Sequence, residues 1–325
     1  MKLLRRQFLR LAASAAALPA VSQIARAQSY PARPVRIVVA ATAGGTTDIL
    51  ARLFGQWLSE RLGQQFLIDN RAGGSNNIGT EVVVRAPADG HTLLLANTVN
   101  AINATLYSRL NYNFIRDIAP VASLDREPNV VVLHPSIPAS TVPEFISFVK
   151  ANAGRVNMGS AGYGTTSHMA SELFKLMTGV RFVHVPYRGG ALALIDLLGG
   201  QIQAMFVTLP GAIEYIKTGK LRALAVTTAA RSEALPVLPT MAEFVPGFEI
   251  SAWYDIAAPQ HTPEAIIDKL NKKINAALAD PDVKVRLADL GGSPLALSPA
   301  EFRKFISDDT EKWAKIIRAA NIKPE

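Results

Sequence analysis

The stretch Arg36-Ile-Val-Val-Ala-Ala-Thr-Ala-Gly-Gly-Thr-Thr-Asp-Ile-Leu50 decides the fold, because it runs from an apolar strand pattern through a glycine loop into a helix pattern. A second stretch, Val156-Asn-Met-Gly-Ser-Ala-Gly-Tyr-Gly-Thr-Thr-Ser-His168, repeats this order. A glycine loop between a strand and a helix N-terminus favours anions, because free backbone N–H groups and the positive end of the helix dipole point to one place. Two such loops predict two similar lobes that present them to a single anionic ligand.

Strand and helix patterns alternate outward from the first loop. A strand over residues 36–40 precedes a helix over Asp48–Leu62, which Gly63 ends. The inner face of this helix is predicted to carry Ile49, Leu53, Trp57 and Leu58. A further helix over Asn76–Arg85 is predicted to bury Ile78, Val82 and Val83. Such alternation predicts a mostly parallel sheet covered on both faces.

The pattern restarts in the middle of the chain. Separate strands are predicted over Ile118–Leu124 and Asn129–Leu133, and the second glycine loop follows a strand over Asn157–Ala161. A helical tail ends the chain. We expect two lobes, with the chain crossing near Ser123–Asn129 and returning near Ile250–Asp255. Open α/β sheets bind ligands beyond the carboxyl ends of their strands, so both glycine loops are expected to line the cleft between the lobes.

The first 27 residues are predicted to be an export signal. They combine a basic start, a mildly apolar stretch and a small-x-small cleavage pattern at Ala25-Arg26-Ala27, which gives Gln28 as the mature N-terminus. Arg5-Arg6-Gln7-Phe8-Leu9 fits the twin-arginine pattern. A general secretory signal with a chance arginine pair is the alternative.

Composition excludes several classes of function. The 325 residues are 49% hydrophobic, which suffices for two domains, and there is no cysteine for disulfides, thiolate catalysis or metal binding. No apolar run is long enough for an ordinary membrane span. Cleavage after Ala27 removes five basic residues and no acid, so the net charge falls from +8 to +3. Nucleic-acid binding therefore loses its main compositional support.

Hydroxyl side chains gather at both predicted helix starts. Thr46, Thr47 and Asp48 can serve as a cap and a dipole-compensating acid, or the hydroxyls and loop amides can donate to a ligand carboxylate. The same two interpretations hold for Thr165 and Thr166. The sequence alone leaves both open.

Three other features have a structural and a functional interpretation. A cationic His168 would oppose the dipole of its helix, so we expect a neutral, packed imidazole rather than a catalytic one. The glycine-rich stretch 71–79 is either a loop with a cap or a third lining of the cleft. Tyr187 follows a strand and can wall a pocket, whereas the adjacent Arg188 is more typical of a surface charge.

No catalytic or metal-binding motif is present. The chain lacks G-x-S-x-G, H-E-x-x-H and G-x-x-x-x-G-K-[ST], and its five histidines have no metal-ligand spacing. The glycine loops also lack the dinucleotide spacing G-x-G-x-x-G. We therefore expect no catalytic residues, metal or cofactor.

Ordered motifs over nearly the whole chain after residue 30 carry a family resemblance. They include Gly44-Gly-Thr-Thr-Asp48, Asp69-Asn-Arg71, Ala88-Asp-Gly-His-Thr-Leu-Leu94, Ser160-Ala-Gly-Tyr-Gly-Thr-Thr-Ser-His168 and Gly219-Lys-Leu-Arg-Ala-Leu-Ala-Val-Thr227. In these motifs the chain resembles the Bug-type solute receptors of tripartite tricarboxylate transporters.

The resemblance implies an α/β periplasmic binding protein fold of type II character, with two mixed sheets, flanking helices and a central cleft. Residues 28–126 and 252–325 would form lobe 1, and residues 127–251 lobe 2. It implies a non-enzymatic periplasmic receptor, a monomer, that holds a small organic carboxylate and works with the membrane permease subunits of a tripartite transporter. The implied ligand-binding residues are Thr46, Thr47, Asp48, Asn77, Thr98, Asn103, Ser160, Ala161, Gly164, Thr165 and Thr166.

Two departures from the family pattern concern the ligand. Ala43 replaces the usual proline before the first glycine pair, and Val207-Thr208 stands where many relatives carry an acid followed by Asn or Ser. Losing that acid predicts plain mono- or dicarboxylates, aromatic ones included, rather than ligands that carry an amine. Tyr187, Val207 and Thr208 complete the predicted ligand-binding site. A periplasmic enzyme or a ligand-sensing subunit on the same scaffold is the alternative.

Overall fold

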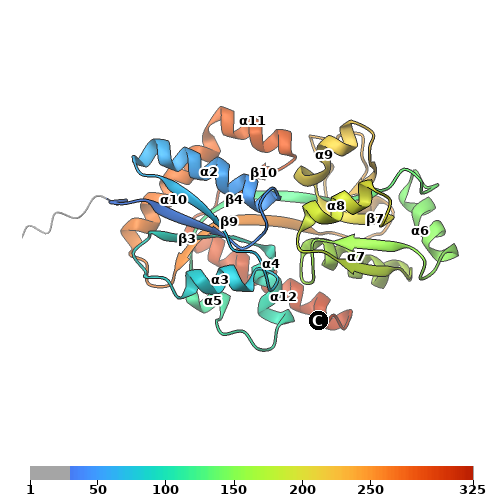
Figure 1. Cartoon of the computed structure of the whole chain (residues 1–325), viewed down its shortest axis with the longest axis horizontal. Helices are drawn as coiled ribbons and strands as arrows, with labels where there is room; N and C mark the ends of the chain where they lie inside the picture. The colour runs from blue at the N-terminus through green and yellow to red at the C-terminus, as the bar shows by residue number, and fades with distance from the viewer. Residues whose placement is uncertain (1–29, 325) are drawn as a thin grey trace, which may run out of the picture.

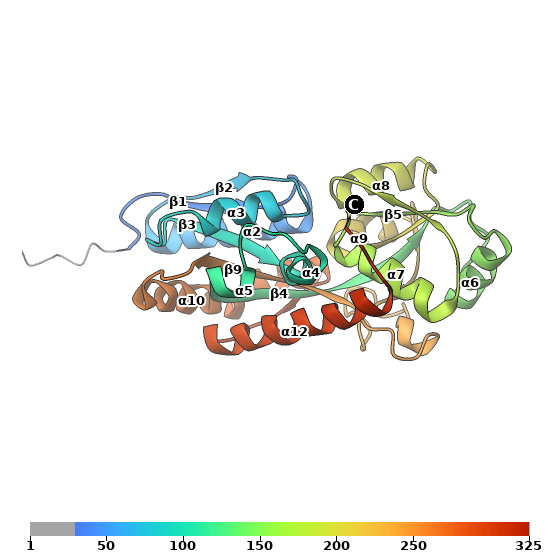
Figure 2. The same ribbon diagram turned by 90° about the horizontal axis from the view of Figure 1, so that it is seen from below.

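The computed structural model describes residues 30–324, which form two lobes joined side by side (Figures 1 and 2). The export signal predicted at residues 1–27 lies outside the described residues. In Figure 1 the first lobe combines the blue and cyan start of the chain with its orange and red end, and the second lobe is green to yellow. The chain therefore leaves the first lobe once and returns to it, and the α/β two-lobed fold expected from the sequence is confirmed.

The sheet of the first lobe is mixed. Its strands are β1 (Val35–Val39), β2 (Phe66–Asn70), β3 (Thr92–Asn97), β4 (Ile118–Leu133), β9 (Ser251–Pro259) and β10 (Ser293–Pro294). Their order is β2–β1–β3–β9–β4, with β10 on β4. β1 is parallel to β2 and β3, whereas β9 is antiparallel to β3 and β4. The carboxyl ends of the parallel strands share one edge, where the first glycine loop begins.

The sheet of the second lobe is built on the far half of β4. Its strands are β5 (Asn157–Ser160), β6 (Val183–Pro186), β7 (Ala204–Thr208) and β8 (Arg222–Val226). β4 pairs antiparallel with β7 and β8, and β5 is parallel to β6 and β7. Since β4 belongs to both sheets, the lobes share one continuous strand.

Helices cover both sheets. Those of the first lobe are α2 (Thr46–Leu62), α3 (Asn77–Val84), α4 (Thr98–Leu106), α5 (Phe114–Asp117), α10 (Glu264–Ala279), α11 (Pro281–Leu290) and α12 (Pro299–Ala319). Those of the second lobe are α6 (Val142–Ala151), α7 (Thr166–Thr178), α8 (Gly190–Leu198) and α9 (Leu209–Lys217), with a 3-10 turn at Met241–Glu243. α12 lies along the underside of the molecule, where it packs on α4 and β4 (Figure 2).

The two strands predicted at Ile118–Leu124 and Asn129–Leu133 are one strand, and that prediction was wrong. The intervening Asp125-Arg-Glu-Pro128 has the composition of a turn, yet β9 pairs with it throughout and Asp125 and Glu127 are fully buried. Two register shifts interrupt this pairing just before the crossing, between Pro120 and Ala122 and between Ser123 and Asp125. The crossing is therefore made by paired strands rather than by linkers.

Two predicted helix faces also differ from the structure. α2 buries Leu50, Phe54 and Leu58, whereas Ile49, Leu53 and Trp57 are only half-buried, because both sides of this helix carry apolar residues. In α3, Val83 is buried but Ile78 is 53% exposed.

Candidate ligand-binding site

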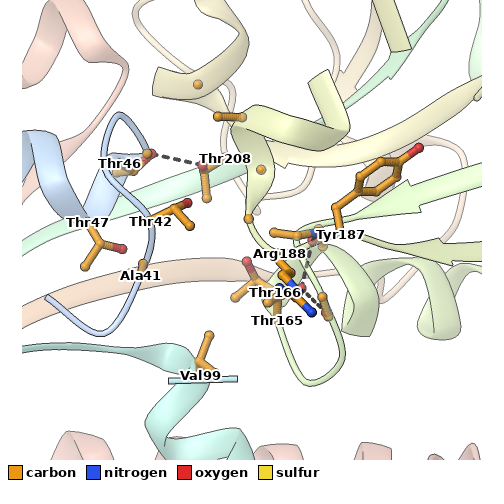
Figure 3. Close-up of a pocket in the computed structure, with 18 of the residues that line it drawn as sticks. Ala41, Thr42, Thr46, Thr47, Val99, Thr165, Thr166, Tyr187, Arg188 and Thr208 are labelled. Carbon is orange, nitrogen blue, oxygen red and sulfur yellow. Dashed lines mark hydrogen bonds between the residues drawn. The ribbon is translucent and has the colours of Figure 1, made fainter. Parts of the chain in front are cut away.

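A cavity of about 920 Å³ lies between the lobes, where both glycine loops meet (Figure 3). Its walls come from the loops after β1 and β5, the starts of α2, α4 and α7, the segment 72–76, and the elements β7, α8 and α9. Its size is typical of small-molecule sites. The prediction that both loops face one cleft is thus confirmed by their positions.

The first glycine loop leaves the start of α2 without a side-chain cap. Gly45 is the N-cap residue, and it has no side chain to cap the first-turn amides. The Thr47 hydroxyl accepts a hydrogen bond from Asn97 Nδ2 at 3.4 Å, which leaves its proton for another acceptor. The amides of Thr46 and Thr47 and one hydroxyl proton therefore remain available at the positive end of the helix dipole.

Asp48 turns away from the cavity. Its carboxylate accepts hydrogen bonds from Gly44 N at 3.0 Å, Arg52 Nε at 2.9 Å and Asn70 Nδ2 at 3.1 Å. Burial alone would raise the pKa of Asp48, but these hydrogen bonds outweigh it and hold that pKa below its usual range. Asp48 fixes the loop and remains an anion that its own neighbours compensate.

The second glycine loop uses its amides within its own lobe. Ser167 Oγ accepts from Ala161 N at 2.9 Å, Ser160 Oγ accepts from Gly162 N at 3.2 Å, and His168 Nδ1 accepts from Gly164 N at 3.2 Å. Thr165 caps α7 and donates its hydroxyl proton to Gly162 O at 2.6 Å. These hydrogen bonds brace the loop. The first-turn amides of Thr166 and Ser167, like those of Thr46 and Thr47, have no hydrogen-bond partner among the described residues.

Stacked aromatic rings support the second loop from behind. The His168 and His184 rings stack at 4.4 Å, and Tyr163 meets both rings edge-on. Ser160 Oγ and His184 Nε2 are 2.6 Å apart. Burial, with Lys175 nearby, lowers the pKa of His168 to about 4. The predicted neutral, packed imidazole is confirmed. Its Nδ1 is the atom that accepts the hydrogen bond from Gly164 N.

The lobes touch at the cavity edge. Thr46 Oγ1 lies 3.1 Å from Thr208 Oγ1 of the opposite lobe (Figure 3). A Cβ placed on Gly189 would lie 2.5 Å from Thr42 Oγ1, so only glycine allows this approach. The two lobes are therefore in direct contact at this edge of the cavity.

The cavity lining carries almost no charge. Among the described residues that line it there is no aspartate or glutamate, and Arg188 is the one ionic side chain. Arg188 is exposed, and no ion pair to it occurs in the described part of the chain. A negatively charged ligand would thus meet amides, hydroxyls and one cation.

Buried acids lie beneath the cavity floor, in the strands that join the lobes. Burial raises the pKa of Asp125 to about 7, and burial together with the Asp125 charge raises that of Glu127 well above its usual value. The neighbouring Tyr254 lines the cavity. Burial, together with the charges of Glu127 and Asp125, raises its pKa. The floor therefore favours the protonated forms of these groups.

The structure places the predicted site residues in two groups. Those that line the cavity are Thr46, Thr47, Thr98, Ala161, Thr165, Thr166, Tyr187, Val207 and Thr208. Those that lie behind the lining are Asp48, Asn77, Asn103, Ser160 and Gly164. Members of the second group act on backbone or on each other: Asn103 Nδ2 donates to Asn77 Oδ1 at 3.0 Å. Tyr187 offers its ring to the cavity, while its hydroxyl donates to Asp196 at 2.7 Å.

The third glycine loop lines the cavity at residues 72–76, in line with the second of its two interpretations. The sequence did not indicate Val99 of α4 or the residues of α8 and α9 that also line it. The available signal for α9 was Pro210, a residue favoured at a helix start, directly after a strand.

Two further searches covered the described residues. No group of three or more His, Asp or Glu side chains among residues 30–324 is arranged to hold a metal ion. None of the described helices is long and apolar enough to cross a membrane.

Sequence comparison identifies relatives over most of the chain. The family described as "Tripartite tricarboxylate transporter family receptor" matches residues 50–322. Protein BugT of Bordetella pertussis is 36% identical over 300 residues, covering 91% of this chain and 92% of that protein. A protein encoded in the tcbD–tcbE intergenic region of a Pseudomonas species is 36% identical over 294 residues, covering 90% of this chain and 88% of that protein.

Solved structures agree with this assignment. Rpa4515 of R. palustris with adipate has a TM-score of 0.89 at 38% identity, covering 91% of this chain and 100% of that chain. The periplasmic binding protein BugD has a TM-score of 0.87 at 32% identity, covering 91% and 100%. MatC of Rhodopseudomonas palustris with bound malate has a TM-score of 0.84 at 30% identity, covering 89% and 100%. On its fold, its cavity and these matches, the chain belongs to the tripartite tricarboxylate transporter receptor family.

Proposed function

We propose that this protein captures a small organic carboxylate between its lobes outside the cytoplasm and delivers it to the membrane permease subunits of a tripartite transporter. The uncapped start of α2 carries the proposal. Thr46 and Thr47, whose amides have no hydrogen-bond partner among the described residues, line a cavity without acidic lining residues. A carboxylate there completes the first turn of the helix and gains charge-assisted hydrogen bonds.

The carboxylate group is supported by the relatives as well as by the site. Two structural neighbours hold adipate and malate, both of them dicarboxylates. Micromolar binding needs about 8 kcal/mol, which a few charge-assisted hydrogen bonds and some apolar burial can supply after the cost of ordering. Val207 in place of an acid favours ligands without an amine, because no lining carboxylate would compensate an ammonium group.

Closure of the lobes is the proposed mechanism. The first lobe (28–126 and 252–325) and the second lobe (127–251) would rotate about β4 and β9, open to admit the ligand and close to exclude water. Thr46–Thr208 and Thr42–Gly189 are contacts of the closed form. The closed form would be the one that docks on the permease.

The site of action is proposed to be the periplasm. The segment 1–27 would direct export by the twin-arginine route, and the mature chain would act as a monomer. Replacing both Arg5 and Arg6 with Lys should abolish export. Export that continues unchanged would favour the general secretory route.

The function is tested by identifying what the protein binds. Native mass spectrometry of the purified protein, followed by a thermal-shift panel of mono- and dicarboxylates, should give one or more carboxylates that raise Tm. Incubation should leave those ligands chemically unchanged. Consumption of the ligand would instead show an enzyme, and tight calorimetric binding of aspartate or glutamate would contradict the preference against amines.

A further inference from the structure

One wall of the cavity is apolar. The wall residues come from α8, β7 and α9 of the second lobe, and we refer to them as the α8–α9 wall: Leu194, Ile195, Met205, Val207, Gly211 and Tyr215. Leu194, Met205 and Val207 are also buried members of the hydrophobic core behind this wall. Core packing therefore holds the wall in shape, which distinguishes it from a flexible apolar loop.

The α8–α9 wall begins next to the proposed carboxylate seat. A Cβ on Gly211 would lie 3.6 Å from Val207, 3.7 Å from Leu194 and 3.9 Å from Thr208 Oγ1. Thr208 in turn lies 3.1 Å from Thr46 Oγ1, at the start of α2. A ligand with its carboxylate on α2 would thus direct its remaining atoms along this wall.

The wall offers apolar surface at the cavity mainly through Ile195, which is 62% exposed and lines the cavity, whereas Leu194, Met205 and Val207 are at most 4% exposed. Gly211 has no side chain over Val207 and Leu194. Exposed apolar surface in a cleft marks a place where apolar ligand atoms bind, because their burial removes both surfaces from water. A compact, hydroxylated ligand would leave this wall in contact with water.

We infer that the α8–α9 wall is a specificity subsite for an apolar body, so that the ligand is a carboxylate with an alkyl chain or an aromatic ring. The inference rests on the proposed carboxylate-binding function. Each methylene that contacts the wall should improve affinity, up to about fourfold where its burial is complete. Affinity for linear dicarboxylates should therefore rise from succinate through adipate to suberate, and phenylacetate should bind more tightly than acetate.

Calorimetry of this ligand series on the unmodified mature protein separates the possible failures. A rise in affinity with chain length supports the subsite. Measurable binding that is flat or falls with chain length overturns the subsite and leaves carboxylate binding standing. Binding to none of these acids overturns both proposals together.

A variant pair locates the effect on the wall. Gly211→Leu should place its side chain over Val207 and Leu194 and fill the space without a backbone clash, because the Cβ contacts are ordinary ones. We expect suberate and phenylacetate to lose tenfold or more in affinity, whereas succinate and acetate change less than threefold. Equal losses for long and short ligands would overturn the assignment.

The matched control is Gly199→Leu, at the end of α8. Its Cβ would also meet only ordinary contacts, the nearest 3.5 Å away at Ile195 O, and Gly199 is exposed and does not line the cavity. We expect unchanged affinity across the series. If Gly199→Leu also weakened suberate selectively, the effect of Gly211→Leu would not come from the wall and the inference would fail.

Discussion

The two glycine loops resemble each other in sequence and differ in how far their own side chains brace the backbone. In the first loop, Gly45 leaves the start of α2 without a side-chain cap, and Thr46 and Thr47 line the cavity. In the second loop, side chains of Ser160, Ser167 and His168 already accept the amides. Both loops therefore connect a strand to a helix through glycine and threonine residues, but the same local structure need not have the same function. In the proposed function the first loop binds the carboxylate, and the second loop is the surface that closes over it.

The largest expected effect comes from placing a negative charge in the first loop. Thr47→Asp keeps a residue that suits a helix N-terminus, so the fold should persist. Two unit charges about 4 Å apart at the effective dielectric of a protein surface repel by about 4 kcal/mol, which corresponds to a loss of about 1000-fold in carboxylate affinity. Isothermal titration with the best ligand of the panel measures it.

Thr165→Asp is the matched change in the second loop. Aspartate is also a good N-cap, so α7 should remain capped. We expect a loss of less than tenfold, because the proposed carboxylate position is on the opposite lobe. Losses of similar size in both loops would contradict the distinction between a binding loop and a braced loop.

Acid should weaken the second loop by protonating His168. Its pKa is lowered to about 4, so the unfolded state binds the proton first as the pH falls from 6.5. The neutral ring therefore contributes stability above pH 6.5 that is lost towards pH 4, about 3 kcal/mol in full. Thermal unfolding across this range should show it. His168→Gln keeps a hydrogen-bond acceptor that does not titrate, so this variant should lose less stability between pH 6.5 and pH 4. If the variant and the parent showed the same pH dependence of Tm, protonation of His168 would not be the cause.

The floor beneath the first loop should respond to pH in the opposite sense. The pKa of Asp125 is raised to about 7, so the folded state binds the proton more tightly than the unfolded state. The stability gained from the neutral form is full below pH 4 and is lost as the pH rises through 7. Asp125→Asn should therefore raise Tm by a few degrees relative to the parent at pH 8, and by less at pH 5.

Glu127→Gln provides the companion test, since burial raises the pKa of both acids and the Asp125 charge raises that of Glu127 further. Its Tm advantage should have the same sign and the same pH dependence. If Asp125→Asn raised Tm as much at pH 5 as at pH 8, ionisation of these two acids would not destabilise the folded protein, and the account of the cavity floor would be wrong.

The smallest expected effect concerns the contact between the lobes. The Thr46–Thr208 hydrogen bond should contribute about 0.5–1 kcal/mol to the closed form. A double-mutant cycle with Thr46→Val and Thr208→Val, read by ligand affinity, measures the coupling. Strictly additive losses would mean that this contact does not help to hold the lobes closed.

Much of this architecture could be predicted from the sequence because the signals are local. Both glycine loops and the αL glycines Gly63 and Gly179 that end α2 and α7 are read from neighbouring residues. The difference between the loops is not local in this sense. It depends on the side-chain directions of Ser160 and Ser167, which a residue pattern does not determine.

The sequence failed where burial opposes composition. Asp125-Arg-Glu-Pro128 is polar and proline-terminated, so it was predicted as a break, yet the junction of two sheets buries it. The short helices α4 and α9 were missed, although both supply lining residues. The α8–α9 wall could not be predicted from the sequence, because its residues are separated along the chain and meet only through the packing of the second lobe.

A crystal structure with the carboxylate that raises Tm most tests the central claim most directly. We predict one carboxylate oxygen within hydrogen-bonding distance, about 2.7–3.1 Å, of the backbone nitrogens of Thr46 or Thr47. The ligand body should lie on the α8–α9 wall. A carboxylate bound instead by the amides of Gly162 and Gly164, with Ser160 and His168 displaced from them, would contradict the account.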